Sequence, residues 1–240
     1  MSLLAQPRVL WRLLRGLPQT GSIADRLAAF YAPQADHYDS TRDGLLHGRP
    51  VLADLLDLAH GMRIVELGAG TGATLDLLGP RVDHLGHVTL VDLCAPLLAV
   101  ARKRAARHPN VTVVEADATT WQPPAPVDAV IFSYALTMIP DWFRAIDNAL
   151  AMLAPGGLIG VTDFHVSRRD PPTGLVRHST AMRHFWPLWF GHDGVRPNPD
   201  HLPYLMDRFD AGVVMERTGS IPGLPGLRAP YYVFTGRKRR

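Results

Sequence analysis

The sequence has little cysteine, no long apolar run and no metal-binding pattern. Its single cysteine, Cys94, cannot form a disulfide within the chain and fits a reducing compartment, so we expect a cytoplasmic protein. No stretch reaches the roughly 18 apolar residues that a bilayer-spanning helix needs, because the longest candidate, 127–140, contains Asp128. Cys94 and the scattered histidines lack metal-ligand spacing, which predicts a protein without a bound metal.

Charge is distributed unevenly along the 240 residues, whose net charge is +3. Three arginines are the only charged residues before Asp25, and four basic residues end the chain. Of the 25 basic residues these seven lie at the ends, which leaves 18 against 22 acidic residues in the body. Basic ends favour an anionic partner, either a lipid surface or a nucleic acid.

The first 20 residues have the pattern of an amphipathic helix. Arg8, Arg12 and Arg15 recur at helical spacing, and the leucines within 10–17 occupy another face. Such a helix would lie on a membrane surface, or would pack on its own domain or on a second subunit in a homo-oligomer. The arginines interrupt the apolar run too often for a secretory signal, although an organelle transit peptide has a similar composition.

Apolar strands alternate with helical stretches from about residue 50 to 165, which is typical of a doubly wound α/β fold. The predicted strands are 63–67, 88–91, 111–115, 127–132 and 158–162, followed by a closing pair at 213–216 and 231–235. The predicted helices are 50–58, 71–78, 95–107 and 142–153. We therefore expect a Rossmann-like, mostly parallel, seven-stranded sheet with an antiparallel last strand.

Two segments fall outside this alternation. Residues 1–49 are predicted to form an N-terminal helical lid facing the membrane, ahead of one domain spanning 50–240. Within that domain, residues 164–210 are rich in proline, histidine and aromatic residues, which predicts an insertion after the fifth strand that caps the ligand crevice and binds substrate.

A glycine-rich turn follows the first strand and indicates a nucleoside cofactor. Residues 65–72 read V-E-L-G-A-G-T-G, so Gly68, Gly70 and Gly72 allow a sharp turn and bring a ligand close to bare backbone. Glu66 would repel a pyrophosphate but suits the ammonium of a methionine moiety, directly or through water. This pattern favours S-adenosylmethionine, although a glycine-rich turn by itself is weak evidence.

Further candidate ligand residues follow the other strands, because ligands of open α/β sheets bind beyond the carboxyl ends of the strands. Asp92 can accept hydrogen bonds from both ribose hydroxyls, and Asp117 lies where an adenine amino group needs an acceptor, beside the backbone of Ala118. The complete predicted cofactor set is Tyr38, Glu66, Gly68, Ala69, Gly70, Gly72, Asp92, Leu93, Asp117, Ala118, Ser133 and Tyr134.

This set resembles the class I S-adenosylmethionine-dependent methyltransferases over residues 61–164, and the Pro-Gly-Gly turn at 155–157 fits that family too. A short-chain reductase would need a Tyr-x-x-x-Lys pair, and no tyrosine here has a lysine four residues later. DNA base methyltransferases would need an Asn/Asp-Pro-Pro-Tyr/Phe motif after the fourth strand, where this chain has Ser-Tyr-Ala-Leu at 133–136.

Three other segments, 30–49, 185–205 and 221–237, resemble the N-methyltransferases of betaine-lipid synthesis. That resemblance implies an enzyme that trimethylates the amine of the lipid diacylglycerylhomoserine in three steps, peripherally bound to an anionic membrane and with no nucleic-acid partner. A second hypothesis keeps the fold but changes the acceptor to a quinone, a sterol or a soluble small molecule. A third is a non-catalytic RNA-binding protein that uses its basic ends.

A betaine product and its carboxylate predict particular substrate contacts. Aromatic faces can hold a trimethylammonium group, and the candidates are Phe185, Trp186, Trp189, Phe190 and Tyr204. Aromatic residues at this helical spacing are also expected in a core or in a wedge that enters lipid. Arginine is the natural partner of the carboxylate, for which Arg42, Arg183 and Arg228 are candidates.

Methyl transfer also requires an unprotonated amine, so a base or a desolvating pocket is expected near the acceptor. The groups considered for this role are Tyr31, Tyr38, Asp163, His165, His184 and His201. Tyr38, Asp163 and His165 are the predicted catalytic residues, and Tyr31, His184 and His201 are assigned to substrate binding. Tyr38 lies in the predicted lid, and the other two catalytic candidates follow the fifth strand.

Overall fold

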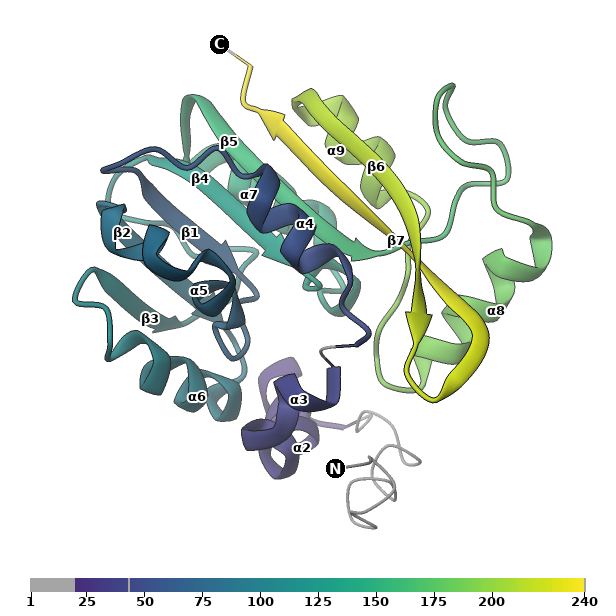
Figure 1. The fold of residues 1–240 in the computed structure, drawn as a ribbon, viewed down its shortest axis with the longest axis horizontal. Coiled ribbons are helices and arrows are strands. Elements are labelled where there is room, and N and C mark those ends of the chain that lie inside the picture. The colour runs from purple at the N-terminus through teal and green to yellow at the C-terminus, as the bar shows by residue number, and fades with distance from the viewer. Residues whose placement is uncertain (1–19, 43, 240) are drawn as a thin grey trace.

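The computed structural model describes residues 20–42 and 44–239 and shows one seven-stranded sheet between two layers of helices (Figure 1). The strands are β1 (Arg63–Leu67), β2 (His87–Asp92), β3 (Val111–Glu115), β4 (Val127–Ser133), β5 (Leu153–Phe164), β6 (Asp210–Ile221) and β7 (Leu224–Arg237). Their spatial order is β3-β2-β1-β4-β5-β7-β6, and β7 runs antiparallel to both of its neighbours. The predicted Rossmann-like, mostly parallel sheet is confirmed.

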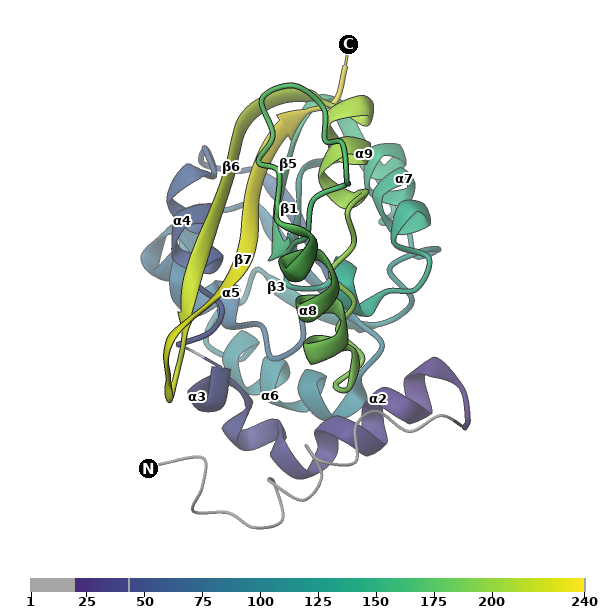
Figure 2. The same cartoon turned by 90° about the vertical axis from the view of Figure 1, so that its right-hand side faces the viewer.

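Helices cover both faces of the sheet (Figure 2). The helices are α2 (Ile23–Tyr31), α3 (Tyr38–Arg42), α4 (Gly48–Leu55), α5 (Ala73–Leu78), α6 (Ala95–Ala105), α7 (Trp142–Met152), α8 (Thr180–Gly191) and α9 (His201–Arg208), with 3₁₀ turns η2 (Ala32–His37), η3 (Gly79–His84) and η4 (Leu136–Met138). Buried side chains of α4, α5 and α6 form the core on one face, and those of α7 and α9 form the core on the other.

The segment 164–210 is more regular than the sequence predicted. Its last helix, α9, buries Leu202 and Leu205 completely against α7 and the final strands. This helix therefore belongs to the helical layer that covers one face of the sheet, and it does not cap a crevice. Prolines in and around the helix hid this periodicity, although Pro203 lies in the first turn, where proline is tolerated. The other helix, α8, lies beyond the end of β5, where Trp186 and Phe190 pack on Phe164.

The described part of the N-terminal segment packs against the body of the domain. Ser22 caps the N-terminus of helix α2, where its hydroxyl accepts a hydrogen bond from the backbone N–H of Asp25 in a capping box. Phe30 and Tyr31 at its other end are buried against the start of α6. The predicted amphipathic helix of residues 1–20 lies almost entirely outside the described residues, so the membrane and homo-oligomer hypotheses attached to it stay predictions.

Candidate active site

A hollow lined by most of the predicted cofactor residues lies at the carboxyl ends of β1, β2 and β4, where the strand order reverses. Its empty volume is about 910 Å³ including space open to solvent, within the range of small-molecule sites. Predicted cofactor residues that line it are Tyr38, Gly68, Ala69, Gly70, Asp92, Leu93, Asp117, Ala118, Ser133 and Tyr134. Glu66 and Gly72 are not part of its wall.

The glycine-rich turn is built for close packing. Gly68, Gly70 and Gly72 have φ values of +73°, +54° and +70°, a conformation that L side chains rarely adopt. A Cβ on Gly68 would overlap the Cβ of Ala135, and one on Gly72 would lie 2.9 Å from Leu90 Cδ1. Gly68 therefore keeps the turn close to the loop after β4, and Gly72 lets α5 begin beside β2.

Asp92 has a fixed orientation at the end of β2. Its Oδ2 accepts a hydrogen bond of 2.8 Å from the Gly70 backbone N–H, and its Oδ1 accepts one of 2.7 Å from that of Cys94. Burial raises the pKa of this carboxyl, and the backbone donors oppose that rise. Each oxygen keeps a lone pair for a further donor, which suits a pair of ribose hydroxyls.

Asp117 and its neighbours form another part of the wall. Its Oδ1 accepts hydrogen bonds from the Thr119 backbone N–H and hydroxyl, both at 2.8 Å, which fixes the loop after β3. Ala118, Leu97 and Ile139 supply apolar surface around it. An apolar slot with a carboxylate at its edge can accept a flat ring that bears an amino group.

Glu66 is almost completely buried at the end of β1, with 3% of its surface exposed. Its Oε1 accepts a 2.6 Å hydrogen bond from the Thr74 hydroxyl, and Oε2 has no partner among the described residues. Burial raises the pKa of this carboxyl to about 7, and Thr74 and Arg49 oppose the rise. An orphaned carboxylate oxygen beside the glycine turn fits the ammonium of a methionine moiety, reached through a bridging water.

Arg49, in the first turn of α4, also lines the hollow and was missed by the sequence analysis. Its Nε donates a 3.1 Å hydrogen bond to the Ser133 hydroxyl, and its guanidinium lies 6.0 Å from the centre of the Tyr134 ring. A guanidinium on this wall is a natural partner for the carboxylate of a methionine moiety. No motif marks Arg49, because 84 residues separate it from Ser133.

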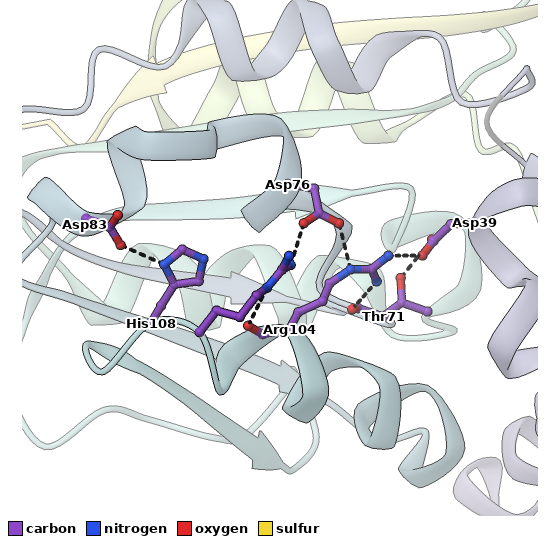
Figure 3. A network of polar contacts seen from close by, with 7 residues as sticks. Asp39, Thr71, Asp76, Asp83, Arg104 and His108 are labelled. Atoms are coloured by element: carbon purple, nitrogen blue, oxygen red, sulfur yellow. Dashed lines mark hydrogen bonds and ion pairs between the residues drawn. The ribbon is translucent and has the colours of Figure 1, made fainter.

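A polar network fixes the described N-terminal segment to the glycine turn (Figure 3). Asp39, next to Tyr38, accepts a 2.8 Å hydrogen bond from the Thr71 hydroxyl and pairs with Arg104 at 2.6 Å. Arg104 also donates to the Thr71 carbonyl and to Asp76. Since these bonds connect α3, the turn, α5 and α6, they hold the Tyr38 backbone at the edge of the hollow.

Comparisons with known proteins agree with this geometry. Residues 64–157 match the family model described as a methyltransferase domain. The N-methyltransferase NodS from Bradyrhizobium japonicum WM9, solved with S-adenosyl-L-homocysteine, superposes with a TM-score of 0.66 at 17% identity, over 89% of this chain and 99% of that one. Residues 64–157 form a methyltransferase domain. Its cofactor is S-adenosylmethionine.

Two curated relatives are also similar to the chain. The 2-phytyl-1,4-naphtoquinone methyltransferase of Thermosynechococcus vestitus is 29% identical over 144 residues, which are 58% of this chain and 64% of that protein. The trans-aconitate 2-methyltransferase of Rhizobium etli is 31% identical over 151 residues, which are 63% of this chain and 56% of that protein. The chain therefore spans less than two thirds of both relatives.

Within the methyltransferase domain, Tyr134, immediately after β4, has a strained backbone conformation. Its φ of +55° is the only positive value of a non-glycine residue among those described. The Gly48 backbone N–H donates to its hydroxyl at 3.1 Å, and its own backbone N–H donates to the Thr162 carbonyl at 2.8 Å. These bonds hold the ring between α4 and β5, and burial raises the pKa of its phenol well above the usual value.

Asp163 and His165, two of the predicted catalytic residues, do not line this hollow. Side chains alternate along β5, and both follow Ile159 and Val161 toward the face covered by α7 and α9. Asp163 accepts hydrogen bonds from the backbone N–H (3.0 Å) and hydroxyl (2.7 Å) of Thr137, and burial raises its pKa to about 7. His165 is held by Glu216 at 2.6 Å. Asp163 thus holds the loop after β4 that borders the hollow, and His165 is bonded to β6.

The predicted substrate residues divide into two groups. Tyr31 lines the hollow, and the Arg42 guanidinium lies over the rings of Tyr38 and Tyr31 at 4.5 Å and 5.9 Å. The other five lie away from the hollow. His184 is exposed on α8, and Trp186 is buried. His201 packs on the Trp142 ring, and the Tyr204 hydroxyl and the Arg228 guanidinium donate hydrogen bonds to Asp147 and Thr218.

The aromatic residues of α8 do not form a cage at the hollow. Phe190 stacks on Phe164 and on Trp186, with centroid distances of 4.4 Å and 5.4 Å, so two of these rings belong to a local core. Phe185 and Trp189 are exposed on the outer face of the helix. The described residues contain no helix long and apolar enough to cross a membrane, and no cluster of three metal-binding side chains.

Binding of S-adenosylhomocysteine is expected to weaken about tenfold from pH 8 to pH 6. Glu66 titrates near pH 7 in the free protein, and a ligand ammonium would lower that pKa because it stabilises the carboxylate. Below pH 7 the ligand must therefore displace a proton, so affinity falls as the pH falls. Isothermal titration calorimetry in buffers of different ionisation enthalpy measures both the affinity and the protons released.

The matched control is Glu66→Gln, which keeps the size of the side chain and removes its titration. This variant should bind more weakly at pH 8 and should lose the part of the pH dependence that Glu66 causes. An identical profile in both proteins would contradict the assignment of Glu66.

Proposed function

We propose that this chain is an S-adenosylmethionine-dependent N-methyltransferase that trimethylates diacylglycerylhomoserine at a membrane surface. The observation that carries methyl transfer is the hollow itself, in which Asp92, Asp117 and Arg49 surround a glycine turn. The bound cofactor would supply an electrophilic methyl group. The chain's residues orient it and exclude water, and alignment of this kind contributes about 7 to 11 kcal/mol.

Three features support an amine as the acceptor. The fold is that of an N-methyltransferase, NodS, although a likeness at 17% identity concerns the fold alone. The rings of Tyr31 and Tyr38 at the edge of the hollow already receive the Arg42 cation, so their faces are suited to a methylated ammonium. The phenol of Tyr31 is buried, and burial raises its pKa well above the usual value, so it stays a neutral neighbour of such a cation.

Lipid as the source of the amine is supported by the surface of α8. Phe185, Leu188 and Trp189 lie at helical spacing and are all exposed, Leu188 by 81%. Apolar side chains on one helix face suit the interfacial region of a bilayer, where aromatic rings gather. We propose peripheral binding of the cytoplasmic protein to an anionic membrane, assisted by the basic ends of the sequence.

A quinone acceptor is the second candidate. The relative from Thermosynechococcus vestitus is named for a phytylated naphthoquinone, and such a molecule is as apolar as a diacylglycerol. The two acceptors differ at the reacting atom, which is nitrogen in one and a ring carbon in the other. An assay that identifies the methylated product therefore separates them.

The test supplies purified protein with methyl-labelled S-adenosylmethionine and anionic liposomes that contain diacylglycerylhomoserine, a demethylated naphthoquinol, or neither. Mass spectrometry of the lipid extract should show mono-, di- and trimethylated amino lipid, and the protein should sediment with the liposomes. Label in the naphthoquinol instead would select the second candidate. Label in neither lipid would reject both.

A further inference from the structure

A second hollow adjoins the cofactor hollow. It lies between α2, the loop carrying η4, the start of α7 and the segment 191–198, which starts at the last residue of α8. Five residues form part of both walls: Ile23, Leu27, Met138, Ile139 and Pro140. A molecule in the second hollow would therefore lie next to a cofactor bound in the first.

The charges that line the second hollow have one sign. Arg26 and Arg196 are the charged residues among the described lining, which also contains the amide of Asn198 and no carboxylate. Within residues 20–42 and 44–239, no acidic side chain pairs with the guanidinium of Arg196, which is exposed. Leu136, Met138 and Trp142 provide apolar surface in the same hollow. This combination suits a molecule with both an anionic group and an apolar part.

The position of Arg196 is fixed through its backbone. Its N–H donates a 2.9 Å hydrogen bond to the carbonyl of Thr137, which also lines the hollow. Thr137 in turn donates two hydrogen bonds to the buried carboxyl of Asp163. The segment that carries Arg196 is thus attached to the sheet through one threonine, so its guanidinium extends from a firmly held backbone.

We propose that the second hollow binds an anionic group of the methyl acceptor, a carboxylate or a phosphate, at Arg196. This deepens the proposed function, on which it rests for the identity of the acceptor, and it replaces Arg228 and Arg183 as the predicted carboxylate partners. The apolar side chains of the hollow receive the adjoining part of the molecule, and the amine extends toward the shared wall and the cofactor.

Calorimetry on the full chain saturated with S-adenosylhomocysteine tests the anion site without a turnover assay. The probes are octanoate, octyl phosphate and octan-1-ol, which share a chain and differ in charge. Wild-type protein should bind at least one of the anions at least tenfold more tightly than the alcohol. Arg196→Ala should lose about tenfold or more of that affinity, and Arg196→Lys should recover part of it, since lysine keeps the charge but not the fork.

The control is Arg144→Ala, which removes another exposed arginine, from α7 and outside both hollows. It should bind the anions as the wild type does, and S-adenosylhomocysteine affinity should be the same in every variant. The preferred anion distinguishes a carboxylate from a phosphate. Unchanged anion binding in Arg196→Ala, an equal loss in Arg144→Ala, or equally tight binding of octan-1-ol would overturn the proposal.

Kinetics separate this proposal from the proposed function. With diacylglycerylhomoserine as acceptor, Arg196→Ala should raise KM about tenfold and change kcat little, because the residue binds the carboxylate and does not contact the transferred methyl. If no amino lipid is methylated but octanoate affinity still depends on Arg196, the proposed acceptor is wrong and the anion site stands.

Discussion

Alanine at position 68 is expected to weaken S-adenosylmethionine binding by about a hundredfold or more while leaving the protein folded. Gly68 has a φ of +73°, and a Cβ there would overlap the Cβ of Ala135 in the loop after β4. The left-handed conformation alone costs about 1 to 2 kcal/mol in a residue with a side chain. Since the turn cannot move toward Ala135, it must move into the space of the ligand.

Gly156→Ala is the matched control for that substitution. Gly156 has nearly the same φ, +75°, but a Cβ built on it meets no atom within 4 Å. Its turn precedes the main part of β5, at the opposite end of the strands from the hollow. In thermal unfolding Gly156→Ala should show the cost of the left-handed conformation alone, Gly68→Ala should lose at least as much stability, and only Gly68→Ala should lose cofactor affinity in calorimetry. Equal cofactor affinity in both would show that Gly68 does not shape the site.

Asparagine in place of Asp92 is expected to weaken cofactor binding by about a hundredfold. The carboxylate accepts hydrogen bonds from the backbone N–H groups of Gly70 and Cys94, and its remaining lone pairs suit two ribose hydroxyls. An amide offers one acceptor oxygen, so its NH₂ group must face either a backbone N–H or a hydroxyl. A hydrogen bond to a charged group contributes about 1.5 to 3 kcal/mol, and about 1.4 kcal/mol corresponds to a factor of ten.

The comparison for this variant is Asp128→Asn. Asp128, near the start of β4, also accepts a backbone hydrogen bond, of 2.7 Å from the N–H of Arg63. This bond lies at the start of β1 and away from the hollow. Equilibrium dialysis with labelled S-adenosylmethionine should show near wild-type affinity for Asp128→Asn. Should Asp92→Asn bind the cofactor equally well, the carboxylate at the end of β2 has no part in holding the ribose.

That these residues line one hollow was predictable, because they lie at or directly after the ends of strands. Gly68, Asp92, Asp117 and Ser133 each occur within a few residues of a strand end, and the carboxyl ends of parallel strands meet at one edge of a sheet. Strands β1 and β3 were also predicted with their observed bounds, because short apolar runs between charged or turn-forming residues have clear limits.

Residues that reach the site from distant elements were not predictable in this way. Arg49 contacts Ser133, which is 84 residues away in the sequence. Arg196 lies at the second hollow because its backbone N–H is hydrogen-bonded to the carbonyl of Thr137. Asp163 illustrates the opposite error. It lies at the end of a strand, as Asp92 does. Because side chains alternate along β5, however, its carboxyl points toward the layer of α7 and α9, where it accepts two hydrogen bonds from Thr137.

The sequence by itself determined the α/β alternation, the glycine turn and the carboxylates that line the first hollow, because these depend on neighbours within a few residues. Tertiary structure decided which arginines line the second hollow, which side chains occupy His165 and His201, and which α8 rings are buried. Those outcomes depend on the side of each strand or helix that the rest of the chain covers, and that is fixed only when segments distant in sequence pack together.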